Sequence, residues 1–590
     1  MTAGPFALPG GWRFERAASV AAPALILMAP LVTYLRFHGF DLLAAEASLC
    51  LAGFAALGLL IGLSCEIRPA ILRPVVLMAM TLPWTLAPAA SGVYSAVEWI
   101  AVWMNVNPEQ STIPVRVASG AVGLLGLWQL ILYWLMRRHI GLIVATVFGV
   151  MLAVAAAGSS GTEPQVVRAA APPPLRADLP PVVHLVLDEH IGVAGIPEDI
   201  PGGRELKRDI VAFYERHGFR LYPNAFSHYW NTEESLSNLV NGTVSPMMQA
   251  NIKIDGMFVL AHNRWFDALR GTGYRIQVVQ TDYLRFCTGG DVEACRTYPP
   301  NSVGSLRDES SVAPTTTIKA ILQTYLENPL RYRTLGPFYE NRVRPAASTL
   351  GIELPEWNWG SINFGPIASK KALAEMFGAI KRRPEGTVFF AHFMLTHNAY
   401  LLAADCNPDK DFLNWMFRND FIQHPMASNT SAGRARRYMR YFEQLRCTYR
   451  LLDDLFAEMR ASGSIDNATI FVHGDHGSRI AMRDPTVHLA ALLSARDIVD
   501  GYSTLYAVRM PGLAPSLSLE TRSIQSLFAE HALGESDRNE SRHVFVLPKV
   551  RRPLTPLFAH NKPFDLELKS DGGQSAAAVA APVVRGDPRP

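Results

Sequence analysis

Two short stretches of the sequence combine side chains that could hold a metal ion. In "FVHGDHGSRI" (471–480), an apolar run ends in Asp475 and His476, a carboxylate beside an imidazole. In "HLVLDEHIG", Asp188 and Glu189 directly follow another apolar run. Carboxylate oxygen and imidazole nitrogen suit Zn²⁺ or Mn²⁺, and two adjacent acids at a strand end are costly unless they are solvated or bound to a cation. We expect one divalent metal ion here, and the alternative interpretation is a turn and a solvated loop.

A third stretch, "NTEESLSNLVNG", offers a hydroxyl group at the start of a helix. Thr232 is followed by two acids and a helix-like run, which is typical of an N-cap. A helix N-terminus also stabilises a phosphate or an oxyanion. A hydroxyl that binds a metal ion loses its proton more easily and becomes a nucleophile. Capping alone is the simpler interpretation, but one residue can serve both purposes.

The elements that would position these residues alternate between strand and helix. Apolar strand candidates are followed by amphipathic helical stretches, which predicts an α/β domain with a mixed, mostly parallel sheet. The predicted strands are 182–187, 275–280, 387–394 and 467–474, and the predicted helices are 204–218 and 436–463. In such sheets, sites lie at the carboxyl ends of strands. Asp188 and Asp475 both occupy that position.

The first 158 residues have a different character. Hydrophobic residues make up 49% of the chain and charged residues only 18%, which is unusual for a wholly soluble protein. The apolar excess lies in five runs that are long enough to cross a bilayer, at 18–36, 42–64, 74–92, 117–136 and 140–158. A signal peptide would explain only one of them. We therefore predict an α-helical membrane domain of five spans.

Basic residues predict the orientation of these spans. Three pairs of arginines fall on one side of the membrane, Arg13 and Arg16, Arg68 and Arg73, and Arg137 and Arg138. That side should be the cytoplasm, so the rest of the chain would lie in a periplasm-like space. The net charge of +3 gives no reason to expect nucleic-acid binding.

These patterns predict four parts of the chain. Residues 1–158 form the transmembrane domain, and 159–180, rich in Ala and Pro, form a semi-rigid linker. Residues 181–565 form the catalytic-sized domain. Residues 566–590 show no apolar periodicity and are predicted to be disordered.

Four cysteines lie outside the membrane part. An even number in an oxidising compartment indicates disulfides. Cys287 and Cys295 would close a short loop and are the first predicted pair, so Cys406 and Cys447 follow by elimination. Four free thiols are the alternative.

Four motifs together carry a resemblance to a known family. "HLVLDEH", "NTEESLSNLVNG", "FFAHFMLTHNAY" and "IFVHGDHGSR" occur in the order found in the alkaline phosphatase superfamily. The sequence resembles its sulfatase-like branch, which includes lipoteichoic acid synthases and phosphoethanolamine transferases. Those enzymes have a similar layout, with five spans and one extracytoplasmic catalytic domain. The resemblance therefore implies a sulfatase/alkaline phosphatase-like fold for 181–565.

The resemblance also implies roles for individual residues. Asp188, together with Glu189 beside it, matches the acidic metal ligand after the first strand. Thr232 matches the nucleophile that is also a metal ligand, and Asp475 and His476 match the remaining ligands. A second set of metal ligands is not apparent, which favours one ion.

Three further residues are candidates for substrate binding. His397 matches a substrate-binding histidine, although Thr396 and Ala399 replace the prolines that usually flank it. His488 lies a dozen residues after His476, where phosphoethanolamine transferases carry a substrate histidine. Arg479 has a fork of donors that could hold a phosphate oxygen, or it is a surface arginine.

The function implied is a membrane-anchored, metal-dependent phosphotransferase. It would move a phospholipid head group, phosphoglycerol or phosphoethanolamine, through a phospho-Thr232 intermediate to a glycan or lipid acceptor. Its expected location is the bacterial inner membrane, with the catalytic domain on the periplasmic side. Thr232 to Leu236 lack the Pro and Arg of the sulfatase signature, so sulfate-ester hydrolysis through formylglycine is not expected. The alternatives are a hydrolase (phosphodiesterase, phosphatase or atypical sulfatase) with the same site and an inactive membrane protein acting in assembly or export.

Overall fold

The computed structural model describes most of the chain outside the membrane part and three long helices within that part. The described residues are 11–67, 75–81, 124, 127–129, 131–136, 139–158, 165–168, 176–252, 258–287, 292–307, 309–330, 347, 349, 362–382, 385–415, 430–487, 489–535, 543–547 and 555–558.

The chain divides into two compact units, each made of two segments. Unit 1 comprises Met1–Glu163 and Leu306–Ser361, and unit 2 comprises Pro164–Ser305 and Ile362–Pro590. The sequence predicts one uninterrupted catalytic domain over 181–565. Within that predicted range, Leu306–Ser361 falls in the same compact unit as the apolar N-terminal helices.

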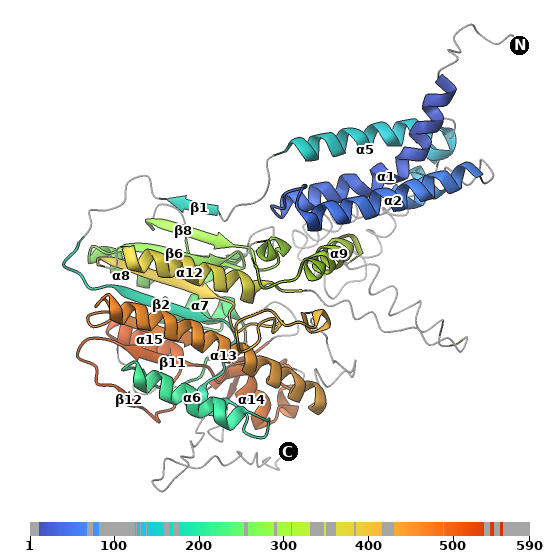
Figure 1. Cartoon of the computed structure of the whole chain (residues 1–590). Coiled ribbons are helices and arrows are strands. Elements are labelled where there is room, and N and C mark those ends of the chain that lie inside the picture. The colour runs from blue at the N-terminus through green and yellow to red at the C-terminus, as the bar shows by residue number, and fades with distance from the viewer. Residues whose placement is uncertain are drawn as a thin grey trace, which may run out of the picture. The chain divides into compact units, whose positions relative to one another are not determined.

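Unit 1 is built on three apolar helices, labelled in Figure 1. They are α1 (Gly11–Phe37), α2 (Ala45–Ile67) and α5 (Ile140–Ala157), and α1 packs against both of the others. Among the described residues, these are the three helices that are long and apolar enough to cross a membrane, over Glu15–Phe37, Ala45–Glu66 and Ile140–Ala157. The apolar N-terminal region therefore contains helices of the length and composition that a membrane span requires.

Among the described residues, the structure gives three candidate spans where the sequence predicts five over the whole N-terminal region. The predicted spans 18–36, 42–64 and 140–158 coincide with α1, α2 and α5. The predicted spans 74–92 and 117–136 lie largely outside the described residues, apart from short helical pieces.

Unit 1 also contains α9 (Pro314–Leu330), which is far from the other helices in sequence. Tyr34 of α1 forms a hydrogen bond with Thr324. The ring of Tyr325 packs edge-on against Tyr34 and against Phe54 of α2, with centroids 5.4 and 5.7 Å apart. These contacts explain why the segment groups with the apolar helices.

Unit 2 is organised around a nine-stranded mixed sheet with the order β1-β8-β6-β9-β2-β10-β11-β3-β12. Its five neighbouring strands β8, β6, β9, β2 and β10 are mutually parallel, so the predicted mixed, mostly parallel sheet is confirmed. The strands are β1 (Gln165–Arg168), β2 (Val182–Leu187), β3 (Arg220–Leu221), β6 (Arg275–Thr281), β8 (Ala294–Tyr298), β9 (Thr387–Phe393), β10 (Thr469–Gly474), β11 (Tyr506–Arg509) and β12 (Ser516–Leu517).

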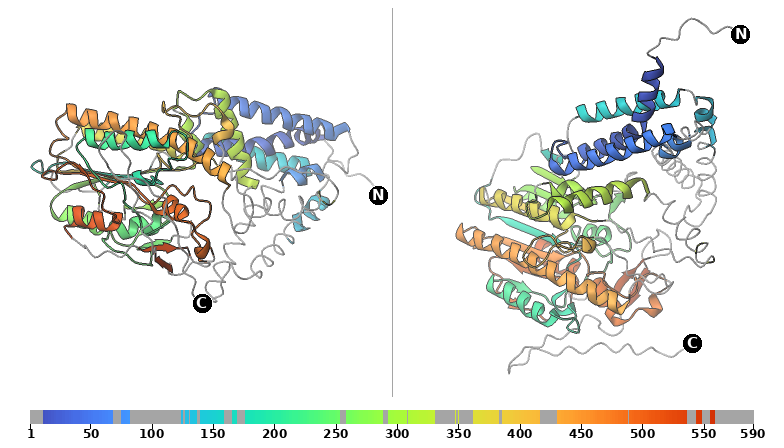
Figure 2. Two further views of the ribbon diagram at one scale, coloured as in Figure 1. Left: turned by 90° about the horizontal axis from the view of Figure 1, so that it is seen from below. Right: turned by 45° about the vertical axis from the view of Figure 1, so that its right-hand side comes forward.

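Helices cover both faces of this sheet, as Figure 2 shows. One face packs against α6 (Gly203–Arg216), α12 (Gly365–Arg382) and α13 (Ser431–Ala461). The other packs against α7 (Thr232–Leu239), α8 (Arg264–Gly271) and α15 (Ile524–Leu533). Because successive side chains of a strand point to opposite faces, Val183 and Leu185 of β2 enter the first core and Val182 and Val186 enter the second. Burial on both faces explains why these strands read as continuous apolar runs.

The smaller elements lie around this core. They are β4 (Ala250–Ile252), β5 (Phe258–Leu260) and β7 (Leu284–Arg285), which form a three-stranded sheet, the pair β13 (His543–Val546) and β14 (Thr555–Phe558), and α14 (Ala495–Tyr502). The predicted linker contains β1, which pairs antiparallel with β8. The predicted disordered tail, 566–590, lies outside the described residues.

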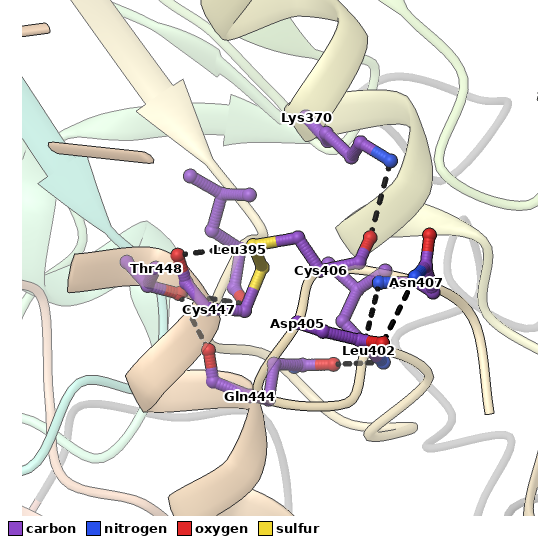
Figure 3. Close-up of a disulfide and its surroundings, with 9 residues drawn as sticks. All are labelled: Lys370, Leu395, Leu402, Asp405, Cys406, Asn407, Gln444, Cys447 and Thr448. Carbon is purple, nitrogen blue, oxygen red and sulfur yellow. Dashed lines mark hydrogen bonds between the residues drawn. A yellow bond between two sulfur atoms is a disulfide. The ribbon is translucent and has the colours of Figure 1, made fainter. Parts of the chain in front are cut away.

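The structure contains both cysteine pairs named from the sequence. Cys287 is joined to Cys295, and Cys406 to Cys447. Figure 3 shows that the second disulfide ties the chain that follows β9 to α13. Nearby, Lys370 Nζ of α12 donates to the Cys406 carbonyl at 3.1 Å. These contacts fasten the loop after β9, which carries His397, to two helices.

Candidate metal centre

Three adjacent parallel strands bring the acidic residues together. In the register of the sheet, Gly474 of β10 lies beside Leu187 of β2, and Leu187 lies beside Phe393 of β9. The next residues of the two inner strands are therefore neighbours, and these are Asp475 and Asp188. The predicted strand-end site is thus built by strand register.

Asp188, Asp475 and His476 form a buried group whose ligand atoms all lie within 4.8 Å of one another. His476 Nε2 is 3.1 Å from Asp475 Oδ2 and 3.7 Å from Asp188 Oδ1. Burial disfavours the charged form of Asp475, but the attraction of His476 outweighs it and lowers the pKa of the carboxyl. Burial likewise opposes protonation of His476, and Asp475 reverses this and raises its pKa.

The N-terminus of α7 brings Thr232 to the same group. Thr232 Oγ1 lies 3.3 Å from His476 Nε2. Ser235, one turn further on, donates from its hydroxyl to the Asp475 carbonyl at 2.6 Å and so fixes α7 against the strand end. Thr232 is the first helical residue and Asn231 is the N-cap, so the predicted capping position is off by one residue. Asn231 takes the extended backbone conformation that is typical of an N-cap.

One oxygen of each aspartate is held, and the other is open. Asp188 Oδ2 accepts from His392 Nε2 at 3.1 Å. Asp475 Oδ1 accepts from the backbone N–H groups of Glu189 and His476, at 3.0 and 2.9 Å. Within the described part of the chain, Asp188 Oδ1 and Asp475 Oδ2 are buried and face His476 Nε2, at 3.7 and 3.1 Å, without forming a hydrogen bond. Buried carboxylate oxygens without partners are costly, and a divalent cation would satisfy both, so these residues fit a metal ion.

His392 is a site residue that the sequence analysis missed. It lies on β9, fully buried, and binds Asp188 directly. Its only sequence signal is a polar residue inside the apolar run "FFAHFM". A second buried pair lies further down the sheet, where His184 Nε2 is 2.7 Å from His473 Nε2.

The Glu189 carboxylate binds residues outside the Asp188–Asp475–His476 group. Its carboxylate accepts from Arg479 Nε at 3.0 Å and from the Asn398 backbone N–H at 3.0 Å. His397 Nε2 lies 3.5 Å from the same carboxylate. The structure therefore brings the predicted substrate-binding residues Arg479 and His397 together around Glu189. His488 lies outside the described residues.

The turn after β10 is held by α14. Gly477 N–H donates to the Gly501 carbonyl at 2.9 Å, and Arg479 N–H donates to the Asp500 carbonyl at 3.0 Å. A Cβ at Gly477 would lie 2.4 Å from that Asp500 oxygen, so only glycine fits there. The Asp500 carboxylate in turn binds Arg434 Nε at 2.9 Å, which anchors α14 to α13.

Comparisons with known proteins are structural only. No protein-family model matches the chain, and no curated protein matches it. The lipoteichoic acid synthase LtaP from Listeria monocytogenes matches with a TM-score of 0.32 and 9% identity, over 62% of this chain and 77% of that one. The C-terminal periplasmic domain of EcEptC from Escherichia coli matches with a TM-score of 0.35 and 10% identity, over 66% and 98%. The phosphonate monoester hydrolase of Agrobacterium radiobacter matches with a TM-score of 0.35 and 11% identity, over 62% and 80%.

With identities of 9 to 11% and TM-scores of 0.32 to 0.35, these likenesses carry no conclusion about the activity of this chain. The reaction is therefore inferred from the side chains of the site.

Proposed function

We propose that the chain is a metal-dependent phosphotransferase that moves the head group of a phospholipid to a glycan or lipid hydroxyl, with Thr232 as the nucleophile. The observation that carries this proposal is the hydroxyl of Thr232 at 3.3 Å from His476, at the edge of a buried group with two open carboxylate oxygens. A hydroxyl in such surroundings is suited to covalent catalysis.

One divalent cation, Mn²⁺ or Zn²⁺, would be held by Asp188, Asp475, His476 and Thr232. When bound, it would supply positive charge that favours the ionised Thr232 oxygen and offsets the charge of the phosphoryl group. The carboxylates are oriented for this in advance, since His392 and two backbone N–H groups fix their other oxygens. Such supporting contacts are typical of metal sites.

In the first half-reaction, a bond forms between Thr232 Oγ1 and phosphorus, and the bond from phosphorus to the diacylglycerol oxygen breaks. Thr232 loses its proton, and the diacylglycerol oxygen gains one. His397 and Arg479 lie on the side of Glu189, where Arg479 can donate to a phosphoryl oxygen and His397 can position or protonate the leaving group. In the second half, the oxygen of an acceptor hydroxyl bonds to the phosphorus, the bond from phosphorus to Thr232 Oγ1 breaks, and the acceptor's proton is transferred so that Thr232 recovers its hydroxyl.

Two features support a lipid donor and an extracytoplasmic site. Three apolar helices of membrane-spanning length suit a chain anchored where phospholipids are found. Both disulfides belong to unit 2, and disulfides persist in oxidising compartments such as the periplasm. The proposed location is therefore the bacterial inner membrane, with unit 2 on the periplasmic side.

The same site could pass the phosphoryl group to water, which would make the chain a hydrolase. The discriminating quantity is the acceptor of the second half-reaction. If an added alcohol receives the head-group phosphate in competition with water, the result supports a transferase. Release of phosphate or phosphomonoester alone, at every alcohol concentration, supports hydrolysis.

The direct test is mass analysis of the full-length protein after incubation with its own membrane lipids and Mn²⁺ or Zn²⁺. Thr232→Ala and Thr232→Ser would be treated in parallel. A metal-dependent adduct on residue 232, present in the wild type and the Ser variant and absent from the Ala variant, supports the proposal, and its mass names the head group. Bound metal with unchanged lipid and no adduct would overturn the lipid-donor transferase.

A further inference from the structure

The geometry points to Glu189 as a positioning residue that holds Arg479 and the His397 loop beside the metal centre, rather than as a ligand of the metal. This inference rests on the proposed metal site. It corrects the simplest interpretation of the Asp188-Glu189 pair, in which both acids serve the cation. It also assigns a purpose to a buried carboxylate that the reaction scheme leaves unused.

The backbone of Glu189 sets the direction of its side chain. Its φ is +64°, a left-handed conformation that is uncommon for a residue with a side chain. The surrounding contacts hold it there, because its N–H donates to Asp475 Oδ1 at 3.0 Å and its carbonyl accepts from the Tyr441 hydroxyl at 2.7 Å. Strained backbone of this kind persists where neighbours over-determine it. Asp188 and Glu189 thus diverge although they are adjacent in sequence.

Both oxygens of the Glu189 carboxylate already accept hydrogen bonds from neighbouring donors. Oε1 accepts from Arg479 Nε at 3.0 Å and lies 3.0 Å from Arg479 Nη2. Oε2 accepts from the Asn398 N–H at 3.0 Å, and Asn398 Nδ2 lies 3.2 and 3.3 Å from the two oxygens. A carboxylate offers about four acceptor positions, so Glu189 has little left for a cation. Asp188 and Asp475 differ, since among the described contacts each keeps one open oxygen.

The backbone of Arg479 is also fixed by its neighbours. Its φ is +52°, and its backbone N–H is bound to the Asp500 carbonyl. The described hydrogen bonds of its side chain use Nε and Nη2 on Glu189, which directs the remaining guanidinium donors elsewhere. The side chain is 23% exposed, so it is not sealed from solvent. An Arg paired by one edge and open at the other suits a phosphoryl oxygen.

Glu189 also keeps Arg479 away from the metal ligands. The guanidinium interacts electrostatically with Asp188 and Asp475 as well as with Glu189. If Glu189 released it, Arg479 would be drawn to those two carboxylates and would compete with the cation for them. The His397 loop would lose its link to Glu189 through Asn398 at the same time. One carboxylate therefore organises both substrate-facing side chains.

The test separates a ligand from a positioning residue by a double-mutant cycle. Mn²⁺ binding to the full-length protein in detergent would be measured by calorimetry for the wild type, Asp188→Asn, Glu189→Gln, Arg479→Gln and Glu189→Gln/Arg479→Gln. Asp188→Asn should weaken binding by about 100-fold or more. Glu189→Gln should weaken it by less than about 10-fold, and the double variant should return to within about 3-fold of the wild type, because the charge balance is restored.

Turnover gives an independent readout. With bis(p-nitrophenyl) phosphate as the probe and saturating Mn²⁺, Glu189→Gln and Arg479→Gln should each lower kcat/KM by about 10-fold or more, and the double variant should be no worse than either single variant. Losses that multiply in the double variant would show that Glu189 does not act through Arg479 and would overturn the proposal.

The metal measurement also decides between two kinds of failure. If Glu189→Gln loses as much Mn²⁺ affinity as Asp188→Asn in both Arg479 backgrounds, Glu189 is a ligand and the positioning role is wrong. If the wild type binds no Mn²⁺ or Zn²⁺ and Asp188→Asn behaves identically, the proposed metal site itself fails. Unfolding temperatures of all variants, measured beside the titrations, identify any variant that does not fold, and Glu189→Asp then replaces Glu189→Gln.

Discussion

The hydroxyl oxygen of Thr232 lies 3.3 Å from Nε2 of His476, although 244 positions separate the two residues in the chain. Two local features create this proximity. Strand β10 delivers His476 to the carboxyl edge of the sheet, and the Ser235 hydroxyl binds the Asp475 carbonyl at 2.6 Å. The nucleophile and the metal ligands are therefore positioned by one helix end and one strand end that contact each other directly.

Thr232→Ala should lower turnover of a phosphodiester by about 10³-fold or more, while Thr232→Ser keeps measurable activity. The unfolding temperature should change little, because Asn231 rather than Thr232 is the N-cap of α7 and Ala is favourable inside a helix. Steady-state kinetics and a thermal melt of both variants check this. Equal activity of the Ala variant and the wild type would remove Thr232 from the mechanism.

His392→Phe should weaken Mn²⁺ or Zn²⁺ binding by about 10- to 100-fold, because it removes the donor that orients Asp188. His392→Gln, which keeps a donor of similar reach, should bind the metal more tightly than His392→Phe. Calorimetric titration of the two variants gives the comparison. If both bind as tightly as the wild type, the hydrogen bond at 3.1 Å does not orient the ligand.

The strand-end residues of the site could be predicted from the sequence for a physical reason. Parallel neighbours in a sheet end at the same edge, so acids after two apolar runs converge there whatever their separation along the chain. Asp188 and Asp475 follow this rule through the paired residues Leu187 and Gly474. The position of Thr232 at the start of a helix could be predicted from the residue types typical of a helix N-terminus. The N-cap itself is Asn231, one residue earlier than predicted.

The parts that could not be predicted depend on geometry that no local pattern encodes. The divergence of Glu189 from Asp188 depends on a left-handed backbone held by Tyr441. The role of His392 depends on strand register, since a histidine in an apolar run also fits simple packing, as His184 shows. The grouping of α9 with the apolar helices depends on contacts of Tyr325 with Tyr34 and Phe54, which lie far earlier in the chain.

Removing the Cys406–Cys447 disulfide should destabilise unit 2 more than removing Cys287–Cys295. In the chain-entropy picture, closing a loop of 41 residues contributes about 4 kcal/mol and closing one of 8 residues about 2.5 kcal/mol. The double Ala variant of each pair, compared by urea unfolding, measures the difference. Equal losses would mean that loop length does not govern the contribution. The Cys406 pair also anchors the loop after β9, shown in Figure 3, so its loss should lower activity as well.

The buried His184 should make unit 2 acid-sensitive. Its Nε2 is 2.7 Å from His473 Nε2, and His473 Nδ1 donates to the Gly474 carbonyl, so one proton joins the two rings. Among the described residues, His184 Nδ1 has no hydrogen-bond partner. A second proton would therefore create a buried charge and a donor without an acceptor. Burial, reinforced by repulsion from His473, holds the pKa of His184 well below its usual value.

The direction of the pH effect follows from proton binding. Below about pH 6.5 the unfolded chain binds a proton at His184 that the folded chain excludes, so stability is complete above that pH and falls by about 1.4 kcal/mol per pH unit below it. His184→Gln keeps a donor toward His473 and removes this loss. Its unfolding free energy, measured in urea at pH 7.5 and pH 5.5, should therefore fall less with acid than that of the wild type. His262→Gln, at an exposed histidine, is the matched control and should retain the wild-type slope. An unchanged slope in the His184 variant would show that the folded chain accommodates the proton at this position.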